Sequence, residues 1–441
     1  MKPLQGFRDF FPEDLAIRNY LFDIWRRIAR SYGFSEFDGP PLEELTLYTR
    51  KSGEEIVGQL YHFVDKGNRD VALRPEMTPT LARMMAARAS QLPKPIKWFC
   101  IPQVFRYERK QRGRLREHFQ LNMDIIGASE VEADAELLSA ALDVLRALGL
   151  SEKDVVARVN DRRLIAGALK HFDVPEDKIP AIYNAIDKFH KVPELTFRDL
   201  LSDAGVPPAH IEELEGLCSK KISLFDWFKS FPEVPPQAES LRALADLDRY
   251  LELLHEAELG GFVEVDFSVV RGLAYYTGIV FELYDRRGEL RAICGGGRYD
   301  NLIASLGGPD LPALGFGMGD VVLTELLKER GLLPELRPRV TVVVIPVGKE
   351  LSGAARTVAR LFREAGIPVE SPYSPAGVGK DLKAADQAGA HFAVIVGPDE
   401  RAAKEVNLKD LRSGKEERFS VERVVEAVRK LASPKLELDI T

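Results

Sequence analysis

The sequence predicts an α+β domain of antiparallel strands flanked by helices, with a helical insertion, followed by a small α/β domain. Three observations predict this class. Hairpin patterns occur at 96–127 and 279–300, proline-broken helices fill 171–262, and valine-rich strands alternate with helices after 340. The expected bounds are 1–170 and 263–330 for the first domain, 171–262 for the insertion and 338–432 for the last domain.

Composition narrows the class of protein. With 441 residues, 45% hydrophobic and 29% charged, the chain is typical of a globular protein of several domains. No apolar run approaches the ~20 residues of a membrane helix, and the amino terminus lacks a signal-peptide core. Three cysteines without a CxxC pair indicate a reducing compartment. We therefore expect a cytoplasmic protein without membrane partners.

Charge and histidine content limit the possible ligands. A net charge of −7 argues weakly against general nucleic-acid binding, although it permits a local basic patch. The seven histidines are scattered, so we expect no metal held by the protein.

The first third of the chain predicts a helix, a hairpin and a second helix. Residues 13–31 are amphipathic, and the pair Pro40–Pro41 that follows excludes a central strand. Alternation over 60–76 around KGNRD predicts a hairpin. A helix is expected to open after Pro79, with Thr78 as its N-cap.

A basic segment follows at 106–116, RYERKQRGRLR, with six basic residues and one acidic residue. A solvated loop explains such a run equally well when it stands alone. Here the flanking strand patterns are the arms of a hairpin, which makes the segment a projecting loop able to meet phosphates. Residues 131–148 predict the next helix.

The stretch 271–282, RGLAYYTGIVFE, is expected to form a strand that continues through the turn RRGE into RAICGGGRYD. One face would carry Arg271 and Tyr276 into a cavity, where the arginine meets an anion. An exposed arginine on an edge strand is the alternative. After this hairpin we expect a glycine-rich strand that leads into a helix, then a linker at 337–340. Alternating strands and helices of the small α/β domain complete the chain.

Several polar residues together fit a zwitterion. Glu76 and Thr78 at a helix entrance suit an ammonium group, although a ligand-free N-cap pair is the alternative. Gln120 and Asp124 share a strand face. The arginines Arg106, Arg114 and Arg271 could hold a carboxylate or a reacting phosphate. The sequence has neither a P-loop nor a GxGxxG junction.

These residues match a known family over nearly the whole chain. FRYE with RKQRGRLREHFQ resembles motif 2 of class II aminoacyl-tRNA synthetases, and GFSEFDGPPLE resembles motif 1, with Pro40 as its proline. RGLAYYTGIVFE and GGGRYDNL resemble the two segments that distinguish histidyl-tRNA synthetases. LRPEMTPT is similar to a substrate loop and 338–432 to an anticodon-binding domain. The resemblance implies a class II catalytic fold and a homodimer.

The resemblance also implies ATP-dependent ligation of L-histidine to tRNA(His) through histidyl-adenylate, with Mg²⁺ expected to accompany ATP. The resemblance also implies a role for each residue that occupies a functional position of a family motif. Arg106 and Arg271 would be catalytic; Arg106, Glu108, Arg114 and Arg271 would bind ATP; Glu76, Thr78, Gln120, Asp124, Tyr276 and Tyr299 would bind histidine; Arg109, Lys110, Gln111 and Arg112 would contact the tRNA acceptor end.

Three departures from the family pattern stand out. Asp124 replaces a frequent glutamate, Ala274 replaces an acid, and Val322 stands where motif 3 has an arginine. Lys328 and Arg330 are candidates to replace that cation. The motif 3 loss favours an alternative, a histidine-sensing regulatory paralogue of ATP phosphoribosyltransferase, whereas the carboxy-terminal domain and the intact motif 2 loop favour the ligase. A synthetase for another amino acid is a third possibility, disfavoured by the two histidine-specific segments.

Overall fold

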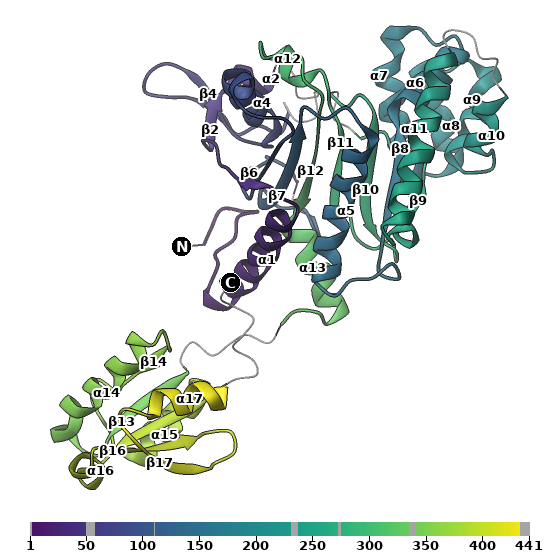
Figure 1. Ribbon diagram of the computed structural model, residues 1–441. Helices are drawn as coiled ribbons and strands as arrows, with labels where there is room; N and C mark the ends of the chain where they lie inside the picture. The colour runs from purple at the N-terminus through teal and green to yellow at the C-terminus, as the bar shows by residue number, and fades with distance from the viewer. Residues whose placement is uncertain are drawn as a thin grey trace. The chain divides into compact units, whose positions relative to one another are not determined.

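A large mixed sheet forms the centre of the first of two units, which divide near Pro334 (Figure 1). The computed structural model describes residues 2–49, 58–109, 111–230, 237–271, 275–334 and 341–432. The expected linker at 337–340 and the final residues after 432 lie outside these ranges.

The strand order of the large sheet is β1-β5-β7-β12-β11-β10-β8-β9, and β6 also pairs with β7. The central pairs are antiparallel, as predicted, whereas the outer pairs β1–β5 and β8–β9 are parallel. The strands are β1 (Ser35–Glu36), β5 (Ile96–Cys100), β6 (Gln103–Phe105), β7 (Glu117–Ile126), β8 (Val155–Asp161), β9 (Val263–Val265), β10 (Ile279–Asp285), β11 (Cys294–Arg298) and β12 (Ala313–Gly319).

One face of this sheet is apolar and packs against helices. Successive side chains of a strand point to opposite faces, so Leu121, Met123 and Ile125 of β7 all lie in the same core. The covering helices are α1 (Pro12–Ser31), α5 (Val131–Ala147) and α13 (Asp320–Arg330). The predicted helix over 13–31 is confirmed, and it buries Leu21, Phe22, Trp25 and Ala29.

Towards one end of the sheet, the other face is covered by α4 (Thr78–Arg88) and the short α12 (Leu302–Ser305). Leu81 and Met85 of α4 pack there against Ile126 and Val280 of the sheet. A small sheet of order β2-β4-β3 adjoins α4 (Figure 1). Its strands are β2 (Leu42–Glu44), β3 (His62–Val64) and β4 (Asp70–Leu73), with α2 (Leu45–Thr49) beside them.

The residues expected to form an insertion are helical and gather beside β8 and β9 (Figure 1). Helix α11 packs against α5 and α6, which connects this group to the core of the sheet. The helices within the expected bounds are α7 (Ile179–Ile186), α8 (Glu194–Ala204), α9 (Ile211–Cys218), α10 (Leu224–Lys229) and α11 (Gln237–Glu256). Helix α6 (Arg162–His171) begins before these bounds.

The second unit is a sheet of order β14-β13-β15-β16-β17 with helices on both faces. Its central strands are buried, as the valine-rich pattern predicts, while β16 and β17 are antiparallel additions. The elements are β13 (Val342–Pro346), α14 (Ser352–Glu364), β14 (Val369–Glu370), α15 (Val378–Gln387), β15 (Phe392–Val396), α16 (Pro398–Ala403), β16 (Glu405–Asp410), β17 (Glu416–Ser420) and α17 (Val424–Ala432).

Two local predictions are wrong. Thr78 is the first residue of α4 and not its N-cap, because Met77 precedes the helix and makes no capping bond. The strand expected from residue 271 begins at Ile279, since Arg271 adopts φ +58°, a left-handed conformation incompatible with an extended strand. Arg271 and Tyr276 therefore precede β10 rather than projecting from it.

In the part of the chain that the structure describes, no helix combines the length and apolar character needed to cross a bilayer.

Candidate active site

A row of glycines faces a row of polar side chains on the sheet face opposite α1 and α5. Gly315 of β12 pairs with Asp124 of β7, and Gly317 pairs with Asn122. A Cβ atom at Gly315 would collide with the Asp124 carboxylate, and one at Gly317 would collide with the Gln120 amide. The glycines therefore let these polar side chains lie across β12.

Asp124 lies at the closed end of this row. It is 2% exposed, and the Tyr299 hydroxyl donates to its Oδ1 at 2.5 Å. Burial raises the pKa of Asp124 to about 7, and the hydrogen bond from Tyr299 opposes this rise. Imidazole has a pKa of about 6.5, so Asp124 can share a proton with an imidazole nitrogen.

A second carboxylate, that of Glu76, is hydrogen-bonded by Tyr275, which is one of three neighbouring tyrosines. The Tyr275 hydroxyl donates to Glu76 Oε2 at 2.9 Å, and Thr78 at the start of α4 also contacts that hydroxyl. The Tyr275 ring lies 5.8 Å from the ring of Tyr299 and 5.1 Å from that of Tyr276. This contact chain joins the Glu76 and Asp124 carboxylates into one site.

Arg271 is a partly buried cation held in the left-handed conformation. Its Nη1 donates to Glu282 Oε1 at 2.5 Å, and its guanidinium lies 5.8 Å from the centre of the Tyr276 ring. Burial disfavours its charge, but Tyr276 and Glu282 outweigh that effect, so the pKa of Arg271 lies above the ordinary value. Its Nε has no hydrogen-bond partner among the residues that the structure describes. A side chain at Gly295 would occupy the space of this guanidinium.

Arg106 is positioned where β6 ends. Its Nε donates to the carbonyl of Pro75 at 2.9 Å, next to Glu76, and its backbone N–H donates to Arg116. His118, on the same strand face as Gln120, is partly buried. Burial lowers the pKa of His118 to about 3, with further contributions from Arg106 and Arg8. This imidazole is therefore neutral near pH 7 and adds no cation to the site.

The basic segment is a loop between β6 and β7, as predicted, and several of its cations already have carboxylate partners. Arg114 pairs with Glu108, and Arg112 pairs with Glu329 and, at 4.0 Å, with Glu325 of α13. Gln111 forms an isolated bridge with Arg114, whereas Arg109 is exposed. Lys110 lies outside the described residues.

Val322 faces this loop from α13. It is 7% exposed, and a Cβ atom at Gly113 would lie 3.2 Å from its Cγ2. An apolar contact thus stands where the family pattern has an arginine. Arg330 cannot replace that cation, because it pairs with Asp285 at 2.5 Å and with Asp154 at 3.2 Å. Lys328 is exposed and lies 4.0 Å from Glu325.

The structure gathers most of the predicted histidine-site residues on one face of the sheet. Glu282, Tyr275 and Asn122 had no predicted role. Alternation could have identified two of them, since Asn122 lies between Gln120 and Asp124, and Glu282 lies two residues from Val280 on the same face. We call the sheet face that carries Gly315 and Gly317 the glycine-floored face. The residues gathered on it are Glu76, Thr78, Gln120, Asp124, Arg271, Tyr276 and Tyr299.

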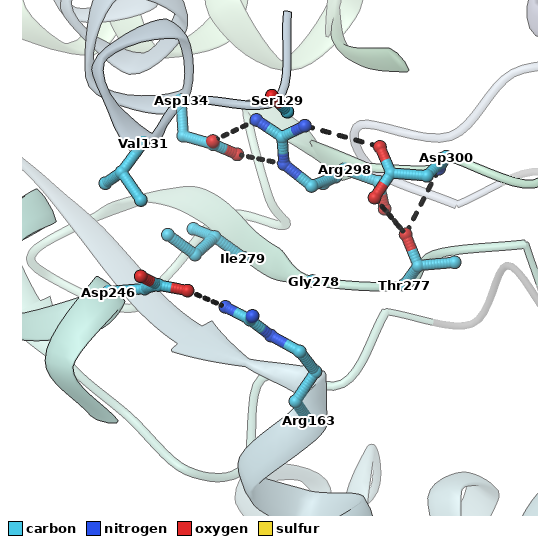
Figure 2. A pocket seen from close by; sticks show the side chains of 10 residues that line it. All are labelled: Ser129, Val131, Asp134, Arg163, Asp246, Thr277, Gly278, Ile279, Arg298 and Asp300. Atoms are coloured by element: carbon cyan, nitrogen blue, oxygen red, sulfur yellow. Dashed lines mark hydrogen bonds and ion pairs between the residues drawn. The ribbon is translucent and has the colours of Figure 1, made fainter. Parts of the chain in front are cut away.

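A separate cavity of about 140 Å³ lies on the opposite face of the sheet (Figure 2). Arg298 reaches it from the α5 side of β11 and pairs with Asp134 and Asp300, while Arg163 pairs with Asp246. None of the predicted site residues lines this cavity. Within the described ranges, no group of three or more His, Cys, Asp or Glu side chains could hold a metal ion.

Comparison with known proteins decides the family. The family model for histidyl-tRNA synthetase matches residues 6–320. The chain belongs to the histidyl-tRNA synthetase family. A second model, described as an anticodon binding domain, matches residues 341–431 of the same chain. The resemblance found in the sequence motifs is therefore confirmed for both units of this synthetase.

Individual relatives agree over the full length. A histidine–tRNA ligase of Opitutus terrae is 44% identical over 429 residues, which cover 97% of each chain. The chloroplastic/mitochondrial histidine–tRNA ligase of Arabidopsis thaliana is 44% identical over 96% of this chain and 85% of its own. The crystal structure of histidyl-tRNA synthetase from Nostoc sp. superposes with a TM-score of 0.82 at 27% identity, covering 98% and 99% of the two chains. The predicted class II fold with a carboxy-terminal domain is confirmed.

Proposed function

We propose that this chain is an ATP-dependent histidine–tRNA ligase, which activates L-histidine as an adenylate and transfers it to tRNA(His). The observation that carries the proposal is the convergence of Glu76, Asp124 and Arg271 on one glycine-floored sheet face. The regulatory-paralogue alternative is disfavoured, because the full-length relatives are ligases and an anticodon-binding model matches 341–431.

The amino acid would lie along β7 with its two ends held by different chemistry. Glu76, Thr78 and Gln120 suit the α-ammonium group, since they offer a carboxylate and two neutral acceptors. Asp124 would meet the imidazole, because its pKa near 7 places a shareable proton at that end. Tyr299 orients the carboxylate, and Tyr276 packs beside it.

The first chemical step forms histidyl-adenylate. A carboxylate oxygen of histidine attacks the α-phosphorus of ATP, the bond to the bridging oxygen breaks, and pyrophosphate leaves with the electron pair. Negative charge develops on the α-phosphoryl oxygens. Arg106 and Arg271 would stabilise that charge. The Nε of Arg271 supports this role, because no described residue accepts its hydrogen.

The second step passes the histidyl group to tRNA. The 3′-terminal hydroxyl oxygen attacks the carbonyl carbon of the adenylate, its proton passes to the departing phosphate, and AMP leaves with the electrons of the acyl–oxygen bond. We propose that Arg109, Lys110, Gln111 and Arg112 contact the acceptor end. Exposure of Arg109 supports this role, whereas Arg112 must exchange Glu325 and Glu329 for phosphate.

The nucleotide would be held without a motif 3 arginine. Arg114 would contact the γ-phosphate, and Glu108 would face the adenine; Glu108 Oε1 is buried without a partner, which supports a ligand contact. Mg²⁺ would arrive with ATP as part of the substrate.

Domain organisation and assembly complete the proposal. We place the catalytic domain at 1–170 and 263–330, the insertion at 171–262 and the anticodon-binding domain at 338–432. The helices that fill most of the insertion support its bounds. The division of the chain near Pro334 supports the boundary before the anticodon-binding domain. A cytoplasmic location fits the three buried free cysteines. A homodimer follows from the motif 1 resemblance.

A pyrophosphate-exchange assay tests the proposal. Histidine-dependent exchange between pyrophosphate and ATP is the expected result, followed by histidine incorporation into tRNA(His). Binding of histidine without exchange would instead support the sensor.

A further inference from the structure

Arg298 ends β11 with its side chain on the far face of the sheet, opposite the glycine-floored face (Figure 2). The side chain is 10% exposed, and its Nε and Nη2 both donate to the carboxylate of Asp134 on α5. The other hydrogens go to the carbonyls of Ala128 and Glu130 and to Asp300 Oδ1. A guanidinium has five N–H donors, so these contacts use all of them. Arg298 can therefore hold structure in place but has no donor left for a ligand.

Asp300 extends this restraint to Thr277. The Asp300 backbone N–H donates to Thr277 Oγ1 at 3.1 Å, and that hydroxyl lies 3.3 Å from both Asp300 Oδ2 and the Arg298 carbonyl (Figure 2). The Thr277 N–H also donates to the Arg298 carbonyl, at 2.7 Å. Main-chain and side-chain hydrogen bonds thus join Thr277 to both Arg298 and Asp300.

These three residues are the sequence neighbours of two tyrosines in the candidate active site. Thr277 follows Tyr276, and Arg298 and Asp300 stand on either side of Tyr299. The two tyrosines pack on the face covered by α4, whereas the three neighbours line the cavity on the far face. A backbone shift in the network would therefore move the aromatic rings of the proposed histidine site.

We propose that Arg298 is a positioning residue for histidine binding, which acts from the far face of the sheet by holding Tyr276 and Tyr299 in place. This inference rests on the proposed function. Arg298 would touch no substrate. The ATP contacts proposed for Arg106 and Arg114 belong to the end of β6 and the loop after it, which lie outside this network. Loss of the network should therefore weaken the binding of histidine and not that of ATP.

Two substitutions of different severity test the role. Arg298→Lys keeps the charge but cannot form the forked contact with Asp134. Its Kd for histidine, measured by isothermal titration calorimetry without ATP, should rise roughly tenfold. Thr277→Val removes the hydroxyl and keeps the N–H, so its Kd should rise roughly threefold to tenfold. Thr277→Ser restores the hydroxyl and should bind histidine as the unaltered protein does. The KM for ATP in pyrophosphate exchange should not change in any of the three.

Arg330 provides a matched control for lost stability. It is another buried arginine of the same unit, with a side chain that is 8% exposed and paired with Asp154 and Asp285. Asp285 ends β10, whereas Thr277 precedes the start of that strand. Arg330→Lys should lower the midpoint of denaturant unfolding, as Arg298→Lys should, but leave the Kd for histidine unchanged. A purely structural role for Arg298 predicts the same result for both variants.

The outcomes separate this inference from the function on which it rests. If the unaltered protein shows no histidine-dependent pyrophosphate exchange, the proposed function fails. If it is active, and folded Arg298→Lys and Thr277→Val both bind histidine with the unaltered Kd, the positioning role is overturned. An equal loss of affinity for histidine and ATP would also overturn it. Should Arg298→Lys not fold, the comparison of Thr277→Val with Thr277→Ser decides the question.

Discussion

Arg271 Nη1 donates to Glu282 Oε1 at 2.5 Å, although the two residues approach the site from different backbone conformations. Arg271 is left-handed at φ +58°, whereas Glu282 lies within β10 and also accepts from the Tyr284 hydroxyl. Backbone strain of this kind persists only where the surroundings enforce it. The carboxylate is therefore in position to fix the direction of the guanidinium proposed to meet the α-phosphate.

Glu282→Gln should weaken that positioning without removing the cation. The neutral amide keeps one acceptor but loses the charge that holds Arg271, so we expect kcat for pyrophosphate exchange to fall roughly tenfold to a hundredfold. The KM for histidine should change less than about threefold. Tyr284→Phe, which leaves the Arg271 contact intact, should have the smaller effect. Wild-type kcat in the Glu282→Gln variant would contradict the positioning role.

Arg271→Ala removes the proposed phosphate contact itself. Loss of a preorganised charge at a reacting phosphoryl group costs about 10²–10³ in rate, so exchange should fall to near background. The circular dichroism spectrum should be unchanged, because the variant leaves the strands and helices of the core in place. Near-normal exchange in a folded Arg271→Ala protein would refute the role given to this arginine.

Asp124 should make stability depend on pH. Its pKa rises from about 4 to about 7 on folding, chiefly by burial, so the folded chain binds more protons between these values. Stability must then decrease as the pH rises from 4 to 7. Asp124→Asn removes this group's contribution, and its free energy of unfolding relative to wild type should increase by a few kcal/mol across that window. Denaturant unfolding at pH 4, 5.5 and 7 measures it; a constant difference would show that the pKa of Asp124 is ordinary.

The outline of the site was predictable because it depends on local rules. Alternation along β7 placed Gln120 and Asp124 on one face, and the structure confirms their pairing with β12. The left-handed Arg271 was not predictable, since an arginine gives no sequence signal for that conformation. Nor was the pairing of Arg112 with Glu329, which are 217 residues apart and meet only through the packing of α13.

Assembly can be tested on the small sheet that follows the motif 1 segment. Phe63 and Val64 of β3 are 50% and 58% exposed, and exposed apolar side chains in a group mark interaction surfaces. Phe63→Asp should convert a dimer into monomers, as measured by sedimentation equilibrium. Leu195→Asp, at an exposed leucine of α8, should leave the mass at twice that of one chain. A Phe63→Asp protein that remains dimeric would place the interface elsewhere.

Arg109 offers the clearest test of the tRNA contact, because its side chain is exposed and forms no ion pair with the residues that the structure describes. Arg109→Ala should raise the KM for tRNA(His) several-fold in aminoacylation and reduce the slope of log affinity against log salt by about one. Pyrophosphate exchange, which needs no tRNA, should be unchanged. Arg287→Ala, at an exposed arginine in the turn between β10 and β11, removes the same charge from the same unit and should alter neither assay. Equal effects of the two variants on aminoacylation would mean that net charge, and not the basic loop, attracts the tRNA.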